Sequence, residues 1–333
     1  MKIAFLEVGS VRADEKESYM EVFGTKEVSF FPGNLSGKHL SELKDIEVLS
    51  VFTTSAITRE VIMKLPHLQF IQTRSTGYNH IDIAAASERS IKVCNVPHYG
   101  DVTVAEYTFA LLFSLARHLG VIGERIKKRD FSFRDVEGFE LAGKKLGVVG
   151  TGRIGKKVVR IARSLGMNVL LYDVYPDEQF AREFDSAYVP LTTLLRDSDI
   201  LTLHAPSTAE THHLLREERF KMMKKRVVIV NTSRGELIHT GDLVRALNNG
   251  IVSAAALDVV ENETMLLKEN LTADEKKMQK ELLSLIAHPH VVFTPHMAYY
   301  SKEATSRIVA TTIETLQGFI SGTKERYLQC LIS

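Results

Sequence analysis

Short apolar runs alternate with helical patterns along almost the whole chain. Each run is about four to seven residues long, which is typical of strands buried on both faces of a parallel sheet. The predicted strands are 3–8, 27–31, 48–52, 68–73 and 91–95 in the first part of the chain, and 145–149, 168–172, 200–204, 227–231, 253–258 and 291–294 in the second. This alternation predicts an α/β protein with parallel sheets.

The predicted strands fall into two groups, which indicates two α/β units with a boundary near residue 100. A long helix over about residues 103–129 is expected to join the units, and a last helix over 302–321 is expected to return to the first unit. We therefore expect one domain made of residues 1–100 with 299–333, and a second made of residues 101–298. A crevice that the chain crosses twice is a natural place for a ligand.

Composition and charge narrow the functional classes. Of the 333 residues, 44% are hydrophobic and 25% are charged, which is close to the globular average and excludes a disordered chain. Lys and Arg number 42 and Asp and Glu number 41, so the formal charge of +1 gives no reason to expect nucleic acid or an anionic membrane as a partner. With two cysteines, a disulfide scaffold and a cysteine-rich zinc site are excluded.

The sequence predicts neither a targeting segment nor a membrane segment. No apolar run reaches the length of about 18 residues that a membrane helix needs. Residues 1–10 have a short apolar core without a small-residue cleavage pattern after it, so we interpret them as the first strand, with a signal peptide as the alternative. We expect a cytoplasmic protein.

A glycine-rich loop follows the predicted strand 145–149. Gly150, Gly152 and Gly155 form a GxGxxG pattern that opens a helix. In such a loop the first glycine permits a tight turn, the second lets the backbone approach a pyrophosphate, and the third lets the helix pack closely on the strand. The pattern predicts a dinucleotide site that also includes Arg153 and Ile154.

Asp173 directly follows the next predicted strand and lies 18 residues after Gly155, at the place where an acidic residue binds a ribose 2′-hydroxyl. A carboxylate there would repel a 2′-phosphate, so Asp173 favours NAD over NADP. Arg153 is a contrary indication, because a nearby arginine can bind a phosphate, although it also suits a pyrophosphate contact.

Three predicted strands deliver ionisable side chains to their carboxyl ends. Arg234 follows one strand, Glu263 follows the next, and His296 follows the last. Ligands of open α/β sheets bind outside the carboxyl ends of the strands. An arginine, an acid and a histidine at that edge are difficult to explain by packing, and they suit hydride transfer coupled to proton transfer.

Over nearly its whole length the chain resembles the NAD-dependent D-2-hydroxyacid dehydrogenases. The resemblance rests on GTGRIG, NTSRGELI, ALDVVENE and TPHMAYYSKEA, and on TRSTGYNHID and NVPHYG nearer the N-terminus. It implies a Rossmann dinucleotide-binding domain, 101–298, inserted in a flavodoxin-like substrate (catalytic) domain, with NAD as the cofactor and a homodimer as the assembly. Tyr99 and the pair Tyr299 and Tyr300 look most like D-lactate dehydrogenases, which favours D-lactate or pyruvate as the substrate.

The resemblance also implies a role for each substrate-contacting residue. Arg234 pairs with the substrate carboxylate and the C2 oxygen, and its planar fork suits that contact. His296 is the general acid in reduction and the base in oxidation, and Glu263 raises its pKa by stabilising the imidazolium. The backbone N–H groups of Thr76 and Gly77 hold the carboxylate, and Tyr99 adds a hydroxyl.

For the cofactor, the resemblance implies that Asp258 fixes the nicotinamide carboxamide. The other residues expected to line the cofactor, beside the glycine loop and Asp173, are His204, Pro206, Thr211, Thr232 and Arg234.

Some alternatives stay open. Thr264 follows Glu263 where the family often has Pro, and the segment 265–290 is long, so Glu261 is an alternative acid. A non-enzymatic NAD sensor, like the corepressors that share this fold, is an alternative function. A phosphite dehydrogenase, which keeps the same three residues, is another, whereas Glu263 argues against a formate enzyme.

No metal site is expected. His212 and His213 are adjacent, and neighbours on a strand point to opposite faces. His288 and His290 lack a nearby third ligand.

Overall fold

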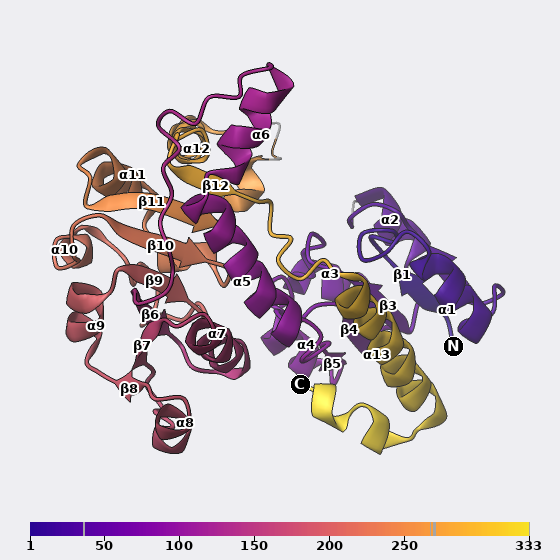
Figure 1. Cartoon of the computed structure of the whole chain (residues 1–333). Helices are drawn as coiled ribbons and strands as arrows, with labels where there is room; N and C mark the ends of the chain where they lie inside the picture. The colour runs from indigo at the N-terminus through magenta and orange to yellow at the C-terminus, as the bar shows by residue number, and fades with distance from the viewer. Residues whose placement is uncertain (36, 267, 269–270, 333) are drawn as a thin grey trace. The chain divides into compact units, whose positions relative to one another are not determined.

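The computed structural model describes residues 1–35, 37–266, 268 and 271–332. Two compact units divide the chain: unit 1 comprises Met1–Gly100 and Tyr299–Ser333, and unit 2 comprises Asp101–Ala298. Each unit has its own parallel sheet, and the elements of both are labelled in Figure 1. None of the described helices is both long and apolar enough to cross a membrane.

Unit 1 is built on a five-stranded parallel sheet in the order β2-β1-β3-β4-β5, which is the flavodoxin-like order. Its elements are β1 (Ile3–Phe5), α1 (Glu15–Phe23), β2 (Val28–Phe30), α2 (Gly37–Glu42), β3 (Val48–Val51), α3 (Arg59–Met63), β4 (Phe70–Thr73), α4 (Ile83–Glu88), β5 (Lys92–Cys94), α13 (Lys302–Ser321), and the short 3₁₀ turns η3 (Lys324–Arg326) and η4 (Leu328–Cys330).

Helices cover both faces of the unit 1 sheet. Ile62 of α3 and Ala86 of α4 belong to the apolar cluster on one face. Tyr19 of α1 packs on the other face with Ile308 and Leu316 of α13. The last long helix, drawn in yellow in Figure 1, therefore contributes to the core of the unit that begins the chain.

Unit 2 is built on a seven-stranded parallel sheet in the order β12-β11-β10-β9-β6-β7-β8. Its elements are α5 (Asp101–Ala116), α6 (Leu119–Lys127), β6 (Lys145–Val149), α7 (Arg153–Ser164), β7 (Asn168–Tyr172), α8 (Glu178–Glu183), β8 (Ala187–Tyr188), α9 (Leu191–Asp197), β9 (Ile200–Leu203), α10 (Glu217–Phe220), β10 (Val227–Asn231), η1 (Gly235–Leu237), α11 (Thr240–Asn248), β11 (Val252–Leu257), η2 (Glu263–Leu266), α12 (Ala273–Ile286) and β12 (Val291–Phe293). Without β12, the six strands read from the β8 edge run β8-β7-β6-β9-β10-β11, which is the Rossmann order 3-2-1-4-5-6.

The unit 2 sheet is also covered on both faces. Leu112 of α5 and Val158 of α7 pack on one face. Leu194 of α9, Leu243 of α11 and Leu282 of α12 pack on the other. The predicted α/β class with two parallel sheets is confirmed, and most strands are buried on both faces, as their unbroken apolar runs indicate.

The prediction of one helix over 103–129 is wrong. Helix α5 ends at Ala116 and α6 begins at Leu119, because His118 has a left-handed backbone with φ 51°. The carbonyl of Ala116 accepts a hydrogen bond from Phe139 N at 3.1 Å, and His118 lies 3.2 Å from the carbonyl of Glu137. A distant segment thus binds the end of α5, which the local pattern does not reveal.

The short edge strand β8 was also missed. It contains only Ala187 and Tyr188, and neither residue is buried, so no apolar run marks it. The long segment 265–290 contains the helix α12, while residues 267 and 269–270 of that segment lie outside the described residues.

Candidate active site

The glycine loop lies between β6 and α7. Gly150 has φ +90°, and a Cβ there would lie 2.5 Å from the carbonyl oxygen of His204. A Cβ on Gly155 would lie 2.0 Å from the carbonyl oxygen of Gly150, whereas Gly152 has no neighbouring atom within 4 Å. The first and third glycines are therefore required by lack of space, and the second leaves the backbone at the start of α7 open to a ligand.

Arg153 and Ile154, which lie between Gly152 and Gly155, differ in their surroundings. Ile154 packs on the apolar layer between α5 and the sheet. Arg153 is largely exposed, and its Nε donates to the Asp101 carboxylate at 3.0 Å. The Arg153 guanidinium already has an acidic partner within unit 2, in addition to any contact with a phosphate.

Asp173 lies directly after β7 and beside the glycine loop. One carboxylate oxygen accepts from the backbone N–H of Thr151 at 2.6 Å and from its hydroxyl at 3.0 Å. The other accepts from the backbone N–H of Tyr175 at 2.9 Å. These bonds hold the carboxylate at the carboxyl end of the sheet, next to the open backbone of Gly152.

His204 follows β9 and faces the same loop. Burial lowers the pKa of His204 to about 3, so its imidazole is neutral at physiological pH. Its Nε2 lies 2.9 Å from the hydroxyl of Thr202, while its buried Nδ1 has no partner among the described residues. An unpartnered buried nitrogen beside an open glycine loop fits a bound dinucleotide.

Two more predicted cofactor residues share one turn after β9. The hydroxyl of Thr211 donates to the carbonyl of Pro206 at 2.7 Å and accepts from Thr208 N at 2.8 Å. Thr232, after β10, is buried, and its hydroxyl lies 2.9 Å from that of Thr108 in α5. These contacts hold the Thr211 and Thr232 hydroxyls in place within unit 2.

Asn231 shapes the loop that carries Arg234. Its side-chain oxygen accepts from the backbone and hydroxyl of Ser233 at 3.1 and 2.9 Å, and its side-chain nitrogen donates to the carbonyl of Arg234 at 2.8 Å. This buried asparagine was not among the predicted site residues. An asparagine that ends a strand and is followed two residues later by serine is a turn signal that could have found it.

Asp258 holds the loop that carries His296. Its carboxylate accepts from the Thr294 hydroxyl at 2.6 Å and from the backbone N–H groups of Met297 and Ala298 at 2.9 Å each. The backbone N–H of His296 donates to the Asp258 carbonyl at 2.7 Å. The residue predicted to contact the nicotinamide thus has a second, structural task that sequence reasoning missed.

Glu263 and His296 are in direct contact. The Nδ1 atom of His296 lies 2.6 Å from a carboxylate oxygen of Glu263, and both side chains are partly exposed. Burial lowers the pKa of His296. The hydrogen bond and charge of Glu263, together with the charge of Asp258, raise this pKa by more than burial lowers it, so the pKa is raised above its usual value. The positive charge of Arg234 acts in the opposite direction and lowers the pKa of His296.

The backbone of His296 is strained. Its φ of 53° lies in the left-handed region, which non-glycine residues rarely adopt. The backbone N–H of His296 donates to the carbonyls of both Asp258 and Thr294, at 2.7 and 3.0 Å, and these bonds hold the conformation. Strain of this kind persists where the surroundings determine the backbone, as at catalytic sites.

The remaining predicted substrate residues belong to unit 1. Thr76 donates from its hydroxyl to the Val96 carbonyl at 3.0 Å, and the Gly77 carbonyl accepts from the Ser75 hydroxyl at 2.7 Å. The ring of Tyr99 packs edge-on against that of Tyr299, with centroids 6.0 Å apart. In unit 2 the structure brings Glu263 and His296 into contact, and Arg234 lies in the loop after β10. Thr76, Gly77 and Tyr99 are described within unit 1 alone.

The alternative acid Glu261 does not contact His296. It pairs instead with His213, whose Nε2 lies 2.6 Å from a Glu261 carboxylate oxygen. His212 and His213 lie in a turn and not on a strand, and their rings are 3.8 Å apart. The argument that their side chains must diverge is therefore wrong, because it assumed strand geometry.

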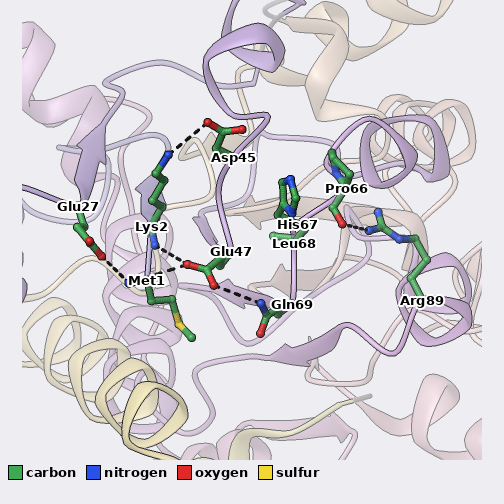
Figure 2. Close-up of a pocket in the computed structure, with 10 residues that line it drawn as sticks. All are labelled: Met1, Lys2, Glu27, Asp45, Glu47, Pro66, His67, Leu68, Gln69 and Arg89. Atoms are coloured by element: carbon green, nitrogen blue, oxygen red, sulfur yellow. Dashed lines mark hydrogen bonds and ion pairs between the residues drawn. The ribbon is translucent and has the colours of Figure 1, made fainter.

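A hollow at the amino ends of β1, β3 and β4 in unit 1 is shown in Figure 2. Several of the polar groups that line it are paired with one another. The backbone and side chain of Lys2 bind Glu47 and Asp45, and Gln69 also binds Glu47. The ligand-binding edge of a parallel sheet is the opposite one, so this hollow is not the candidate site.

Comparison with known proteins agrees with the family resemblance found in the sequence. Residues 109–298 match the family described as "D-isomer specific 2-hydroxyacid dehydrogenase, NAD binding domain". The chain is 34% identical to D-lactate dehydrogenase of Escherichia coli over 325 residues, which is 97% of this chain and 98% of that protein. It is 36% identical to a hydroxypyruvate reductase of Blautia hydrogenotrophica over 289 residues, 85% of each chain.

A solved structure is similar over the full length. D-lactate dehydrogenase from Aquifex aeolicus, in complex with NAD and lactic acid, aligns with a TM-score of 0.90 and 35% identity, covering 99% of both chains. The carboxyl edge of the unit 2 sheet carries the glycine loop and the Arg, Glu and His side chains. The chain belongs to the D-isomer-specific 2-hydroxyacid dehydrogenase family, an NAD-dependent family of oxidoreductases.

Proposed function

We propose that the protein interconverts pyruvate and D-lactate with NAD(H). The observation that carries this proposal is the contact of 2.6 Å between His296 Nδ1 and a carboxylate oxygen of Glu263. The positive charge of Arg234 acts on the same imidazole and lowers its pKa. An acid–base group and a cation at the edge of a dinucleotide-binding sheet suit the reduction of a carbonyl next to a carboxylate.

The proton is carried by His296. Glu263 binds Nδ1 and stabilises the imidazolium, so Nε2 is left to donate a proton. In reduction, bound NADH supplies a hydride to C2 of the 2-oxo acid, and the C2 oxygen takes the proton from His296, which gives a 2-hydroxy acid and NAD⁺. In oxidation the neutral imidazole takes that proton back.

Arg234 binds the negative groups of the substrate. Its fork pairs with the carboxylate and stabilises the charge that develops on the C2 oxygen, so it acts on the transition state as well as on binding. Asn231 holds the loop in which this arginine stands. The cofactor roles assigned to Asp258, Asp173 and the glycine loop belong to the same proposal.

For unit 1 we propose a role in carboxylate binding for the backbone N–H groups of Thr76 and Gly77. In the part of the chain that the structure describes, no protein group accepts from either N–H. Their carbonyls and the Thr76 hydroxyl are already bonded, which fixes the loop. We propose that Tyr99 adds a hydroxyl to the substrate site.

The substrate is tested by following NADH oxidation with pyruvate, glyoxylate, hydroxypyruvate, phenylpyruvate and 2-oxoisocaproate. We expect the highest kcat/KM with pyruvate, and D-lactate as the product. A higher kcat/KM with hydroxypyruvate or phenylpyruvate would replace pyruvate in this proposal and leave the reaction type intact. No oxidation of NADH with any 2-oxo acid would overturn the reaction type as well.

We also propose that the protein is a homodimer that pairs through α6 and the loop after it. Helix α6 has no buried residue although it carries Leu119 and Ile126, and Phe131 and Phe133 are 78% and 90% exposed. Light scattering after gel filtration should give about twice the chain mass of 37.4 kDa. Ile126→Glu with Phe133→Ser should give a monomer, whereas a monomeric wild type would contradict the proposal.

A further inference from the structure

We propose that His212, His213 and Glu261 in unit 2 form a binding site for a divalent transition metal ion such as Zn²⁺. Each of these residues offers one ligand atom, and the three atoms lie within 4.8 Å of one another. Two imidazoles and a carboxylate match the ligands that Zn²⁺ and Ni²⁺ prefer, whereas Mg²⁺ and Ca²⁺ prefer oxygen alone.

Two of the three ligands are already in place. His213 Nε2 lies 2.6 Å from one Glu261 oxygen, and the other Glu261 oxygen accepts from the backbone N–H of Thr240 at 3.3 Å. The Glu261 side chain is only 15% exposed and that of His213 26%. A metal ion would replace the proton between the His213 nitrogen and the Glu261 oxygen, and that proton would leave to solvent or move to Nδ1.

The third ligand comes from an exposed side chain. His212 is adjacent in the chain, and its ring lies 3.8 Å from that of His213 at an interplanar angle of 37°. The left-handed backbone of His213, with φ 49°, turns both rings to the same side. Because Zn–N bonds are about 2.0–2.1 Å long, His212 has to rotate inward by a small amount, which an exposed side chain can do.

The site is connected to both loops that carry the proposed catalytic residues. Glu261 is separated from Glu263 by Asn262 alone. A Cβ on Gly235, the residue after Arg234, would lie 2.5 Å from the backbone nitrogen of Glu261, so the two loops are in direct contact. A metal ion between His213 and Glu261 needs more room than their hydrogen bond of 2.6 Å leaves. We therefore infer that a bound metal ion displaces the Glu261 side chain, shifts Glu263 relative to His296, and slows turnover.

Metal binding is tested by titrating ZnCl₂ into the full chain, without an affinity tag, in a calorimeter. We expect one equivalent to bind in the wild type and affinity to fall at least tenfold in His212→Ala and in His213→Ala, since even the loss of an outer partner weakens metal binding about 10–100-fold. The matched control replaces the other close histidine pair, His288 and His290, whose rings are 5.6 Å apart, by alanine and should bind normally.

A second variant separates this site from the catalytic pair. His296→Ala should retain the binding event. If His296→Ala abolishes binding, or if His212→Ala and His213→Ala leave the affinity unchanged, the proposed site is wrong. Replacing ZnCl₂ by MgCl₂ should give no heat of binding, and equal binding of Mg²⁺ would also contradict the assignment.

The effect on turnover rests on the proposed reductase activity, whereas metal binding does not. With pyruvate and NADH, saturating Zn²⁺ should lower kcat several-fold in the wild type, EDTA should restore it, and His212→Ala should keep its activity in the presence of Zn²⁺. Binding without a change in kcat would overturn the inferred coupling. A wild type that binds Zn²⁺ but never oxidises NADH would instead overturn the proposed function.

Discussion

Arg74 and Glu15 in unit 1 are completely buried, whereas His296 and Glu263 in unit 2 have side chains that are 47% and 34% exposed. Both pairs combine a basic group with a carboxylate, yet their surroundings differ. The Arg74 guanidinium donates to the Leu6 carbonyl at 2.6 Å and to the Ser50 hydroxyl at 3.1 Å. Every contact of Arg74 is internal, so it can hold backbone segments together but cannot meet a substrate.

Only the pair in unit 2 can exchange a proton with a ligand. One nitrogen of His296 is bound by Glu263, and the partly exposed ring leaves the other nitrogen for chemistry. In unit 1, burial raises the pKa of Glu15 although Arg74 lowers it, so the carboxylate is paired at the cost of desolvation. The comparison teaches that a fully buried charged pair marks structure here, and a half-exposed pair marks the reaction.

The largest effect is expected from removing the imidazole of the exposed pair. His296→Ala should lower kcat by about 10²–10⁴-fold, the usual contribution of general acid–base catalysis. Its midpoint of unfolding in urea should stay close to that of the wild type, because the side chain is half exposed. Steady-state NADH oxidation and circular dichroism measure the two quantities, and near-full activity of the variant across neutral pH would contradict the assignment.

The opposite pattern is expected for the buried pair. Arg74→Met should lower the free energy of unfolding by about 3–5 kcal/mol, because it leaves Glu15 buried without its partner. The control is Arg59→Met, which removes an exposed ion pair with Glu88 and should cost less than about 1 kcal/mol. Urea unfolding measures both variants, and equal costs would show that burial does not distinguish the pairs.

A smaller effect is expected from Asp173, a carboxylate with both a structural task and a proposed binding task. It stabilises the glycine loop through Thr151 and is proposed to bind the NAD ribose. Asp173→Ser should lower kcat/KM for NADH about tenfold, since a hydrogen bond to a charged group contributes about 1.5–3 kcal/mol, and should raise the ratio of activity with NADPH to that with NADH. Equal wild-type rates with NADH and NADPH would remove the argument for Asp173.

The parts of the fold that depend on local pattern could be predicted from the sequence. Strand 145–149, the glycine loop and the helix after it are adjacent in the chain, and their apolar and glycine positions are sufficient to predict them. The break between α5 and α6 could not be predicted, because the carbonyl of Ala116 is bound by the backbone N–H of Phe139, which lies 12 residues beyond the end of α6 at Lys127.

The candidate site divides in the same way. Arg234, Glu263 and His296 could be proposed because each follows a predicted strand, and their roles remain proposals. The contacts that hold these three residues in place could not be predicted from the sequence. Asp258 binds residues 36 to 40 positions later, and His213 binds Glu261 48 positions later. Such pairs depend on how the strands are ordered in the sheet, which no local pattern contains.

The most direct test of the proton transfer by His296 is the pH dependence of kcat/KM for pyruvate reduction in the wild type and in Glu263→Gln. Reduction needs the imidazolium, so kcat/KM should fall as pH rises through the pKa of His296, which Glu263 raises above its usual range. Without the carboxylate that pKa drops, so the fall in Glu263→Gln should occur at lower pH. The same pair stabilises the folded state at low pH and loses this contribution as pH rises through the raised pKa. Superimposable profiles, or a fall at higher pH in the variant, would contradict the assignment of His296 as the proton donor tuned by Glu263.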